Sequence, residues 1–329
     1  MAEYKGIKGF QVQTRTEDPS PTEAQAGDFY YNSSTGQFKA VNIGGAPIGT
    51  WASGGDLNDA RSQIGGVGTQ TAAICIGGNT PPETGNTEQY DGSSWTEVNN
   101  LNTARRITQG MGTVYTAALA VGGYYPPGYS TFVESWNGSS WTEITEVNSA
   151  KGAGGQAGTS TAGIVFAGVP GGPQATNEYW NGSSWTELAE LNSARTNIGS
   201  AGTAYTAALA IAGSSPTANV AIVEEWDGSS WTEISDLNQA RQELAGAGTS
   251  TLALASAGTG PSTTGKTEAW DGSSWTEIAD LATARREVNT QASNSQTSAL
   301  VFGGKTTPYR SETEEFTAAD FQIKSVTQS

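Results

Sequence analysis

The chain contains 329 residues, among them 43 glycines, ten tryptophans, one cysteine and no histidine, and its net charge is −16. Without histidine it has no Ser-His-Asp or Cys-His triad and no His-containing zinc site, and the lone Cys75, in an apolar run, excludes an intrachain disulfide and a CxxC cluster. The acidic balance argues against nucleic acid or an anionic membrane as the main partner, because phosphate contacts need clustered Lys and Arg.

Residues 1–50 are predicted to form an N-terminal arm and a β-hairpin that serve as an attachment module. Pro19, Pro21 and mixed polar residues in 1–26 are typical of an extended arm. In residues 27–39, two aromatic strands flank an Asn-Ser-Ser-Thr-Gly turn. This segment resembles short β-modules of bacteriophage tail-fibre and other virion proteins, which implies other virion proteins as partners. We expect neither a signal peptide nor a membrane span, because no run approaches 18 apolar residues.

Residues 51–316 consist of a repeat of about 45 residues. The segment Trp-Asp/Asn-Gly-Ser-Ser-Trp-Thr-Glu occurs four times, and a fifth copy has Tyr90 in place of the first Trp. The second aromatic residue of these copies is Trp95, Trp141, Trp185, Trp231 and Trp275, and Trp51 lies one period earlier. A period of this length with several short strands is typical of a β-propeller with one blade per repeat.

Each repeat predicts four strands. The first follows an Ala-Arg or Ala-Lys pair, the second is a small apolar run such as Ala117–Val121, the third contains Glu-x-aromatic, and the fourth is Trp-Thr-Glu-apolar. The Asp/Asn-Gly-Ser-Ser segment between the third and fourth strands is predicted to be a tight hairpin. The last repeat lacks a fourth-strand Trp, whereas a surplus one precedes the first repeat, so we expect the strand at Trp51 to complete the last blade.

Each repeat is similar to the kelch motif in the order of its parts: Arg, a strand ending in Gly-Gly, a variable loop, Glu-x-Tyr/Trp-Asp and a Trp. Gly-Gly is kept in three repeats and becomes Ala-Gly in the other three. The resemblance implies an all-β fold, a six-bladed kelch-like β-propeller closed by one N-terminal strand and three C-terminal strands. Residues 317–329 are predicted to be a C-terminal tail.

A Glu stands two positions before the third-strand aromatic residue in all six repeats, and a basic residue opens the first strand in all six. The carboxylates could form a ring that binds metal or sugar, or each could pair with the basic residue of its own blade. Sixfold recurrence favours structural pairs, among them Arg105 with Glu134, Arg195 with Glu224 and Arg241 with Glu268. The Asp/Asn-Gly-Ser-Ser turns lack the acidic density of a calcium loop, so we expect no metal, no cofactor and no catalytic residue.

The loops between the second and third strands are where the repeat stops repeating. They are residues 79–86, 124–131, 169–176, 214–221, 259–266 and 305–311. Varied loops on a repeated scaffold are typical of a binding surface, although unselected drift would also vary them. The candidate binding residues are Tyr124, Tyr125 and Tyr129 in the second loop and Tyr309 and Arg310 in the sixth, because rigid aromatic rings stack on sugars or anchor proteins.

Three functions compete. The residues favour a non-enzymatic bacteriophage virion protein, on the tail, a fibre or the capsid surface, that binds virion proteins through its arm and a host-surface glycan or protein through its propeller. The alternative is an intracellular kelch-type adaptor for a protein partner. A glycan-active enzyme is disfavoured: kelch-type copper oxidases need histidine ligands, and sialidase-like propellers need an arginine cluster, whereas these arginines are spread one per blade.

Overall fold

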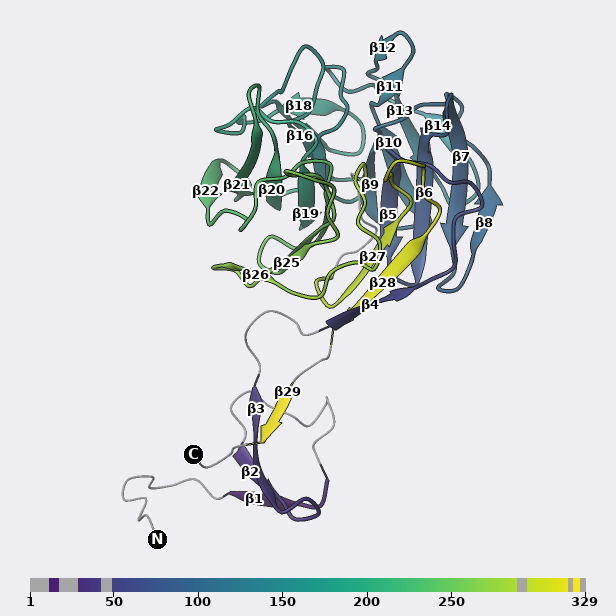
Figure 1. Cartoon of the computed structure of the whole chain (residues 1–329). Helices are drawn as coiled ribbons and strands as arrows, with labels where there is room; N and C mark the ends of the chain where they lie inside the picture. Colours follow the sequence, from purple (N-terminus) through teal and green to yellow (C-terminus); the bar gives the residue numbers. More distant parts are fainter. Residues whose placement is uncertain (1–11, 18–28, 43–48, 289–294, 319–321, 326–329) are drawn as a thin grey trace. The chain divides into compact units, whose positions relative to one another are not determined.

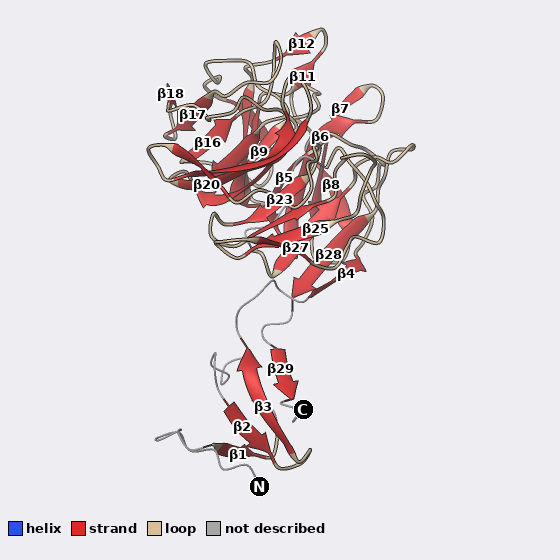
Figure 2. Ribbon diagram, turned by 60° about the vertical axis from the view of Figure 1, so that its left-hand side comes forward, coloured by secondary structure: helices blue, strands red, loops and turns tan. Residues whose placement is uncertain are grey.

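A computed structural model of the chain describes residues 12–17, 29–42, 49–288, 295–318 and 322–325. The described residues form strands and loops with no helix, so the fold is all-β, as expected (Figure 2). The chain divides into two compact units, unit 1 with residues 1–45 and 319–329, and unit 2 with residues 46–318 (Figure 1).

Unit 1 contains a four-stranded sheet in the order β1(Gln13–Arg15), β2(Phe29–Asn32), β3(Gln37–Asn42) and β29(Gln322–Ser325). The predicted hairpin is confirmed, since β2 pairs antiparallel with β3 from Phe29–Ala40 to Asn32–Gln37. The Asn32 side-chain oxygen accepts the backbone N–H groups of Ser34 and Thr35, which stabilises the turn. The predicted extended arm lies largely outside the described residues, but β1 pairs in parallel with β2.

The C-terminal segment differs from the sequence-based expectation of a tail at 317–329. Strand β28(Thr313–Ala318) continues two residues past the predicted end of the repeats at 316. Strand β29 then pairs antiparallel with β3, with Gln322 opposite Asn42 and Ser325 opposite Lys39. Segments from the two ends of the chain therefore share one sheet, and the boundaries between the units fall at 45–46 and 318–319 rather than at 50 and 316.

Unit 2 contains five four-stranded antiparallel sheets and one of three strands in the described residues. Sheet 1 is β5(Gly65–Thr69), β6(Ala72–Asn79), β7(Glu83–Tyr90) and β8(Trp95–Val98); sheet 2 is β9(Gln109–Val114), β10(Ala117–Val121), β13(Val133–Trp136) and β14(Trp141–Glu143); sheet 3 is β15(Gly155–Gly158), β16(Gly163–Phe166), β17(Asn177–Trp180) and β18(Trp185–Glu187). Sheet 4 is β19(Gly199–Ala204), β20(Ala207–Ser214), β21(Asn219–Trp226) and β22(Trp231–Ile234); sheet 5 is β23(Ala245–Gly248), β24(Ala253–Ser256), β25(Thr267–Trp270) and β26(Trp275–Glu277). A two-stranded hairpin, β11(Tyr124–Tyr125) and β12(Gly128–Tyr129), extends from sheet 2.

Sheet 6 joins β27(Ser298–Phe302) and β28 to a strand from the start of unit 2, β4(Gly49–Ser53). Trp51 lies opposite Phe316, with 5.3 Å between the ring centroids, so the pairing predicted for the strand at Trp51 is confirmed. The predicted first strand of this repeat includes residues 289–294, which lie outside the described residues.

The first strands of successive sheets contact one another, β5 with β9, β9 with β15, β15 with β19 and β19 with β23, and β27 contacts both β23 and β5. Between these strands lies a narrow cavity of about 40 Å³ lined mostly by backbone of glycine, alanine and serine residues. A Cβ atom on Gly246 would lie 2.3 Å from the Ser200 carbonyl oxygen, so the small residues of these strands permit direct backbone contact.

The tryptophans pack between neighbouring sheets. Trp226 and Trp231 of sheet 4 lie in one buried cluster with Ile164 and Phe166 of sheet 3, and the Phe166 and Trp231 rings are 4.8 Å apart. Burying a large aromatic side chain contributes about 1.5–3 kcal/mol, so these contacts supply much of the cohesion between sheets. The Trp-Thr-Glu signature of the sequence therefore marks the positions at which one sheet packs on the next.

Candidate functional site

The variable loops gather at one end of the sheets of unit 2, which we call the loop face. It comprises the loops between the second and third strands of each sheet: residues 80–82, 122–132, 167–176, 215–218, 257–266 and 303–312. The start of each repeat lies beside its loop, as in the backbone bridges Arg106–Tyr124 and Arg286–Lys305. Strand β28 begins at this face and ends at Ala318, opposite Gly49, so these two residues lie at the other end of sheet 6 from its variable loop.

Just below the loop face lie the six repeated ion pairs. They are Arg61–Glu88, Arg105–Glu134, Lys151–Glu178, Arg195–Glu224, Arg241–Glu268 and Arg285–Glu314, and every side chain is at most 4% exposed. The pairs expected from the sequence are thus present, including the three named above. Their burial leaves no carboxylate free for a ligand, so these residues hold strand three of each sheet to the start of strand one.

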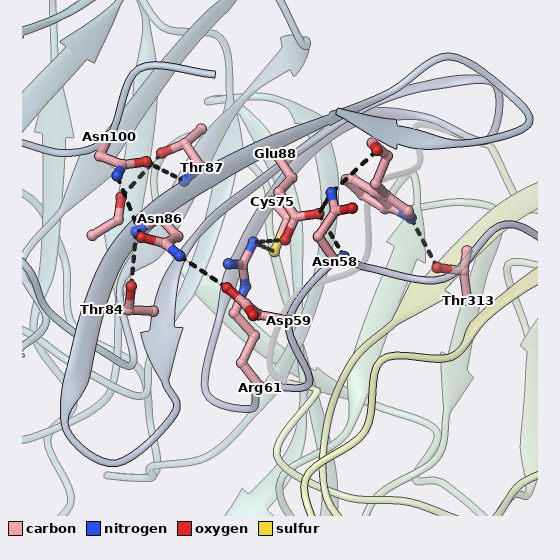
Figure 3. Close-up of polar contacts among 12 residues, drawn as sticks. Asn58, Asp59, Arg61, Cys75, Thr84, Asn86, Thr87, Glu88, Asn100 and Thr313 are labelled. Atoms are coloured by element: carbon pink, nitrogen blue, oxygen red, sulfur yellow. Dashed lines mark hydrogen bonds and ion pairs between the residues drawn. The ribbon is translucent and has the colours of Figure 1, made fainter. Parts of the chain in front are cut away.

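Each carboxylate also caps the segment that precedes the basic residue. In sheet 1 the Arg61 guanidinium lies 2.8 Å from one Glu88 oxygen, while the other accepts the Asn58 backbone N–H at 2.8 Å and its side-chain amide at 2.7 Å (Figure 3). Arg61 also donates to the Cys75 sulfur, and burial raises the pKa of that thiol to about 11. A buried thiol with a raised pKa is a poor nucleophile, so Cys75 serves as a packed core residue.

Sheet 3 departs from the pattern because Lys151 replaces arginine. Its Nζ lies 3.2 Å from Glu178 and donates to the Thr176 hydroxyl. Burial lowers the pKa of Lys151, and the opposing charge of Glu178 does not fully offset it. The Ser149 hydroxyl adds a hydrogen bond of 2.6 Å to Glu178, which replaces part of the lost guanidinium fork.

The three tyrosines of the second loop have different surroundings. Tyr124 and Tyr129 face each other across the β11–β12 hairpin with their ring centroids 5.5 Å apart, and the Arg106 guanidinium lies 4.7 Å from the Tyr124 ring centroid. Only Tyr125 is exposed, at 46%. Tyr125 has its own neighbour in the loop, since its ring centroid lies 6.1 Å from that of Phe132. The structure therefore brings the three predicted tyrosines together in one hairpin, with Tyr125 the most accessible, and their role in binding stays a prediction.

The sixth loop lies against the first sheet. The Tyr309 hydroxyl accepts a hydrogen bond of 3.1 Å from the Asn79 amide, and the Lys305 Nζ lies 5.1 Å from the Tyr309 ring centroid. Arg310 forms an ion pair of 2.9 Å with Glu312 and donates to the Thr306 hydroxyl at 3.1 Å. Tyr309 and Arg310 therefore organise their own loop, and they lie apart from the tyrosines of sheet 2.

The loop face carries three partly exposed cations besides Arg310 that the sequence pattern did not mark as binding residues. Unit 2 has eleven Lys and Arg residues, and six of them belong to the buried pairs. Of the remaining five, four lie at the loop face with 28–35% of their side-chain surface exposed: Arg106, Arg286, Lys305 and Arg310. The sequence did contain a signal for two of them. The position directly after the repeated basic residue holds a cation in only two of the six repeats, and these cations are Arg106 and Arg286.

Each of these cations has an acidic neighbour. Arg106 lies 3.2 Å from Glu83, Arg286 lies 3.3 Å from Glu243, and Lys305 lies 3.9 Å from Glu287. Burial, followed by the charge of Glu287, raises the pKa of Glu243, while Arg286 opposes the rise. These three cations are therefore balanced by acidic partners, in a chain whose net charge is −16.

Within the described residues, no three His, Cys, Asp or Glu side chains are grouped to hold a metal ion. None of the described segments forms a helix long and apolar enough to cross a membrane. A scan against protein-family models and a search of curated proteins found no match to this chain. The function must therefore be argued from the geometry.

Proposed function

We propose that this chain is a non-enzymatic bacteriophage virion protein, a component of the tail, a fibre or the capsid surface. In this proposal unit 2 is a six-bladed kelch-like propeller that presents its loop face to a host-surface glycan or protein. Unit 1 docks onto other virion proteins. The observation that carries the proposal is the presence of two different units. Unit 1 is a small sheet built from both ends of the chain, and unit 2 is a repeated unit whose variable loops lie at the opposite end of its sheets from Gly49 and Ala318.

A ring of six blades accounts for the order of contacts in unit 2. The first strands contact in sequence, and β27 contacts β5 as well as β23. Backbone hydrogen bonds follow the same order: Ile107 N–H to Gln63 O at 2.7 Å, Asn197 to Ala153 at 2.7 Å, Glu243 to Asn197 at 2.8 Å and Gln63 to Glu287 at 2.9 Å. The last bond joins the first repeat to the sixth, which supports closure of the ring.

Unit 1 has the chemistry of a docking module. Its described residues include Val12, Phe29 and Phe38, each 43–46% exposed, and the two phenylalanine rings stack with centroids 5.6 Å apart. Exposed aromatic residues that lie together on a small sheet favour burial against a partner. The same hairpin resembles virion modules, which supports a virion protein as that partner.

Purified virions of the phage that encodes the chain test the proposal. Mass spectrometry of washed particles should find the polypeptide at a constant copy number, and its absence from particles would refute the proposal. Phe29→Ser with Phe38→Ser should remove the full-length chain from particles. Leu252→Ser, which changes a residue of unit 2 that is 48% exposed, is the matched control and should leave incorporation unchanged.

A further inference from the structure

A cleft lies at the loop face between the loops of sheets 5 and 6. Its volume is about 480 Å³, within the range of small-molecule sites. Hydroxyl groups and one guanidinium dominate its lining: Thr259, Ser262, Thr263, Thr306, Thr307 and Arg286. No carboxylate lines the cleft, although the unit as a whole is strongly acidic.

Arg286 lies at the inner wall of this cleft in a position to bind an anion. Its side chain is 35% exposed, and its Nη1 donates to Glu243 at 3.3 Å. The guanidinium carries further N–H donors on Nε and Nη2, in the fork geometry that matches a carboxylate. Lys305 pairs in the backbone with Arg286, but its Nζ lies 3.9 Å from Glu287 and it does not line the cleft, so Arg286 is the cation of this lining.

We propose that this cleft binds a carboxylated sugar of an acidic glycan. The Arg286 guanidinium would receive the carboxylate, and the five hydroxyl groups would exchange hydrogen bonds with the hydroxyls of the ring, since both donate and accept. The cleft is large enough for one or two sugar rings. This inference rests on the proposed function in that it names the ligand class of the loop face.

The surroundings of the cleft disfavour a longer polyanion. Arg286 is the one cation of the cleft lining, and Glu243 and Glu287 pair with Arg286 and Lys305, so no track of unpaired cations continues from the cleft. Nucleic acid needs a track of cations along successive phosphates. A short acidic oligosaccharide fits this distribution of charge, because one of its carboxylates can meet Arg286 while the hydroxyls of that ring meet the threonines.

Calorimetric titration of the full-length chain with tetragalacturonate tests the inference, with maltotetraose as the neutral counterpart. We expect tetragalacturonate to bind and maltotetraose to bind at least about tenfold more weakly, because the charged hydrogen bonds are missing. Arg286→Gln should weaken tetragalacturonate binding by about tenfold or more, and Thr307→Val by about threefold. The thermal unfolding midpoint of each variant should lie within about 2 °C of that of the wild-type chain.

Arg106→Gln is the matched control, since Arg106 has the same place in its repeat and similar exposure but lies beside the tyrosines of sheet 2. It should change tetragalacturonate binding by less than about twofold. Unchanged binding in Arg286→Gln, equal binding of maltotetraose, or displacement by inorganic phosphate at equal concentration would overturn the inference. The titration needs only the purified chain, so its failure is distinguishable from absence of the chain from virions.

Discussion

Arg285 and Arg286 are adjacent in the chain, yet they belong to two different regions of unit 2. Arg285 is fully buried and pairs with Glu314 at 2.8 Å, in a contact that recurs in all six repeats. Arg286 is 35% exposed at the loop face, where only one other repeat has a cation at that position. Burial therefore separates a residue that holds the fold from one able to meet a ligand, although the residue type is the same.

Breaking a buried ion pair should lower the stability of the fold more than any change at the loop face. Arg195→Met leaves Glu224 buried and without its cation, and we expect the free energy of unfolding to fall by about 3–5 kcal/mol. Chemical denaturation at pH 7 measures the loss. The double variant Arg195→Met, Glu224→Leu should recover part of it, because no charge stays unpaired although the Asn192 and Ser193 N–H groups lose their acceptor. A loss below about 1 kcal/mol in the single variant would show that the pair is dispensable.

Lys151→Met should lower the free energy of unfolding less at pH 7, because Arg195 also donates to the Ala212 and Ile222 carbonyl oxygens, whereas Lys151 adds only the Thr176 hydroxyl to its ion pair. The same substitution should also change how the free energy of unfolding depends on pH. Burial lowers the pKa of Lys151 in the folded chain, so the unfolded chain binds more protons and wild-type stability rises as pH increases from the folded pKa to the unfolded value of about 10.4. Denaturation curves across this range should show that the variant lacks this rise, and an identical slope would contradict the assignment.

Arg286→Gln should lower the free energy of unfolding by only about 0.5 kcal/mol, because its pair with Glu243 is partly exposed and weakly coupled to folding. The same denaturation experiment on Arg285→Gln, one residue away, is the comparison and should show a loss several times larger. If the two variants lost equal stability, the distinction between the buried pairs and the loop face would fail.

The smallest effect should come from the exposed turns at the other end of the sheets. The Ser230 backbone N–H and then the Ser229 hydroxyl hold the pKa of Asp227 at about 2. Its contribution to stability is present above the unfolded pKa of about 3.9 and is lost as pH falls through about 2. Asp227→Asn copies Asn137 and Asn181, which occupy the same turn position in two other repeats. It should leave the free energy of unfolding at pH 7 unchanged and reduce its fall at low pH. Acid denaturation of the variant and the wild-type chain measures this difference.

The sequence predicted the repeated parts well because their signals are local. Strand positions, the Asp/Asn-Gly-Ser-Ser turns and the ion pairs all follow from residues within one repeat, and the missing last strand predicted the pairing of Trp51 with Phe316. The binding residues stay a prediction. The sequence named Tyr124 and Tyr129 but could not show that their rings pack on each other, because that contact depends on how the β11–β12 hairpin folds.

The sequence by itself determined the all-β class, the period of the repeat and the chemistry of the six buried pairs, since each depends on spacing within about 45 residues. Only the tertiary structure decided that β29 joins β3 and that Arg286 shares a cleft with hydroxyls from two neighbouring loops. Such contacts join segments that no local period relates. Their formation depends on how the sheets pack, which is where the candidate binding site of this chain is made.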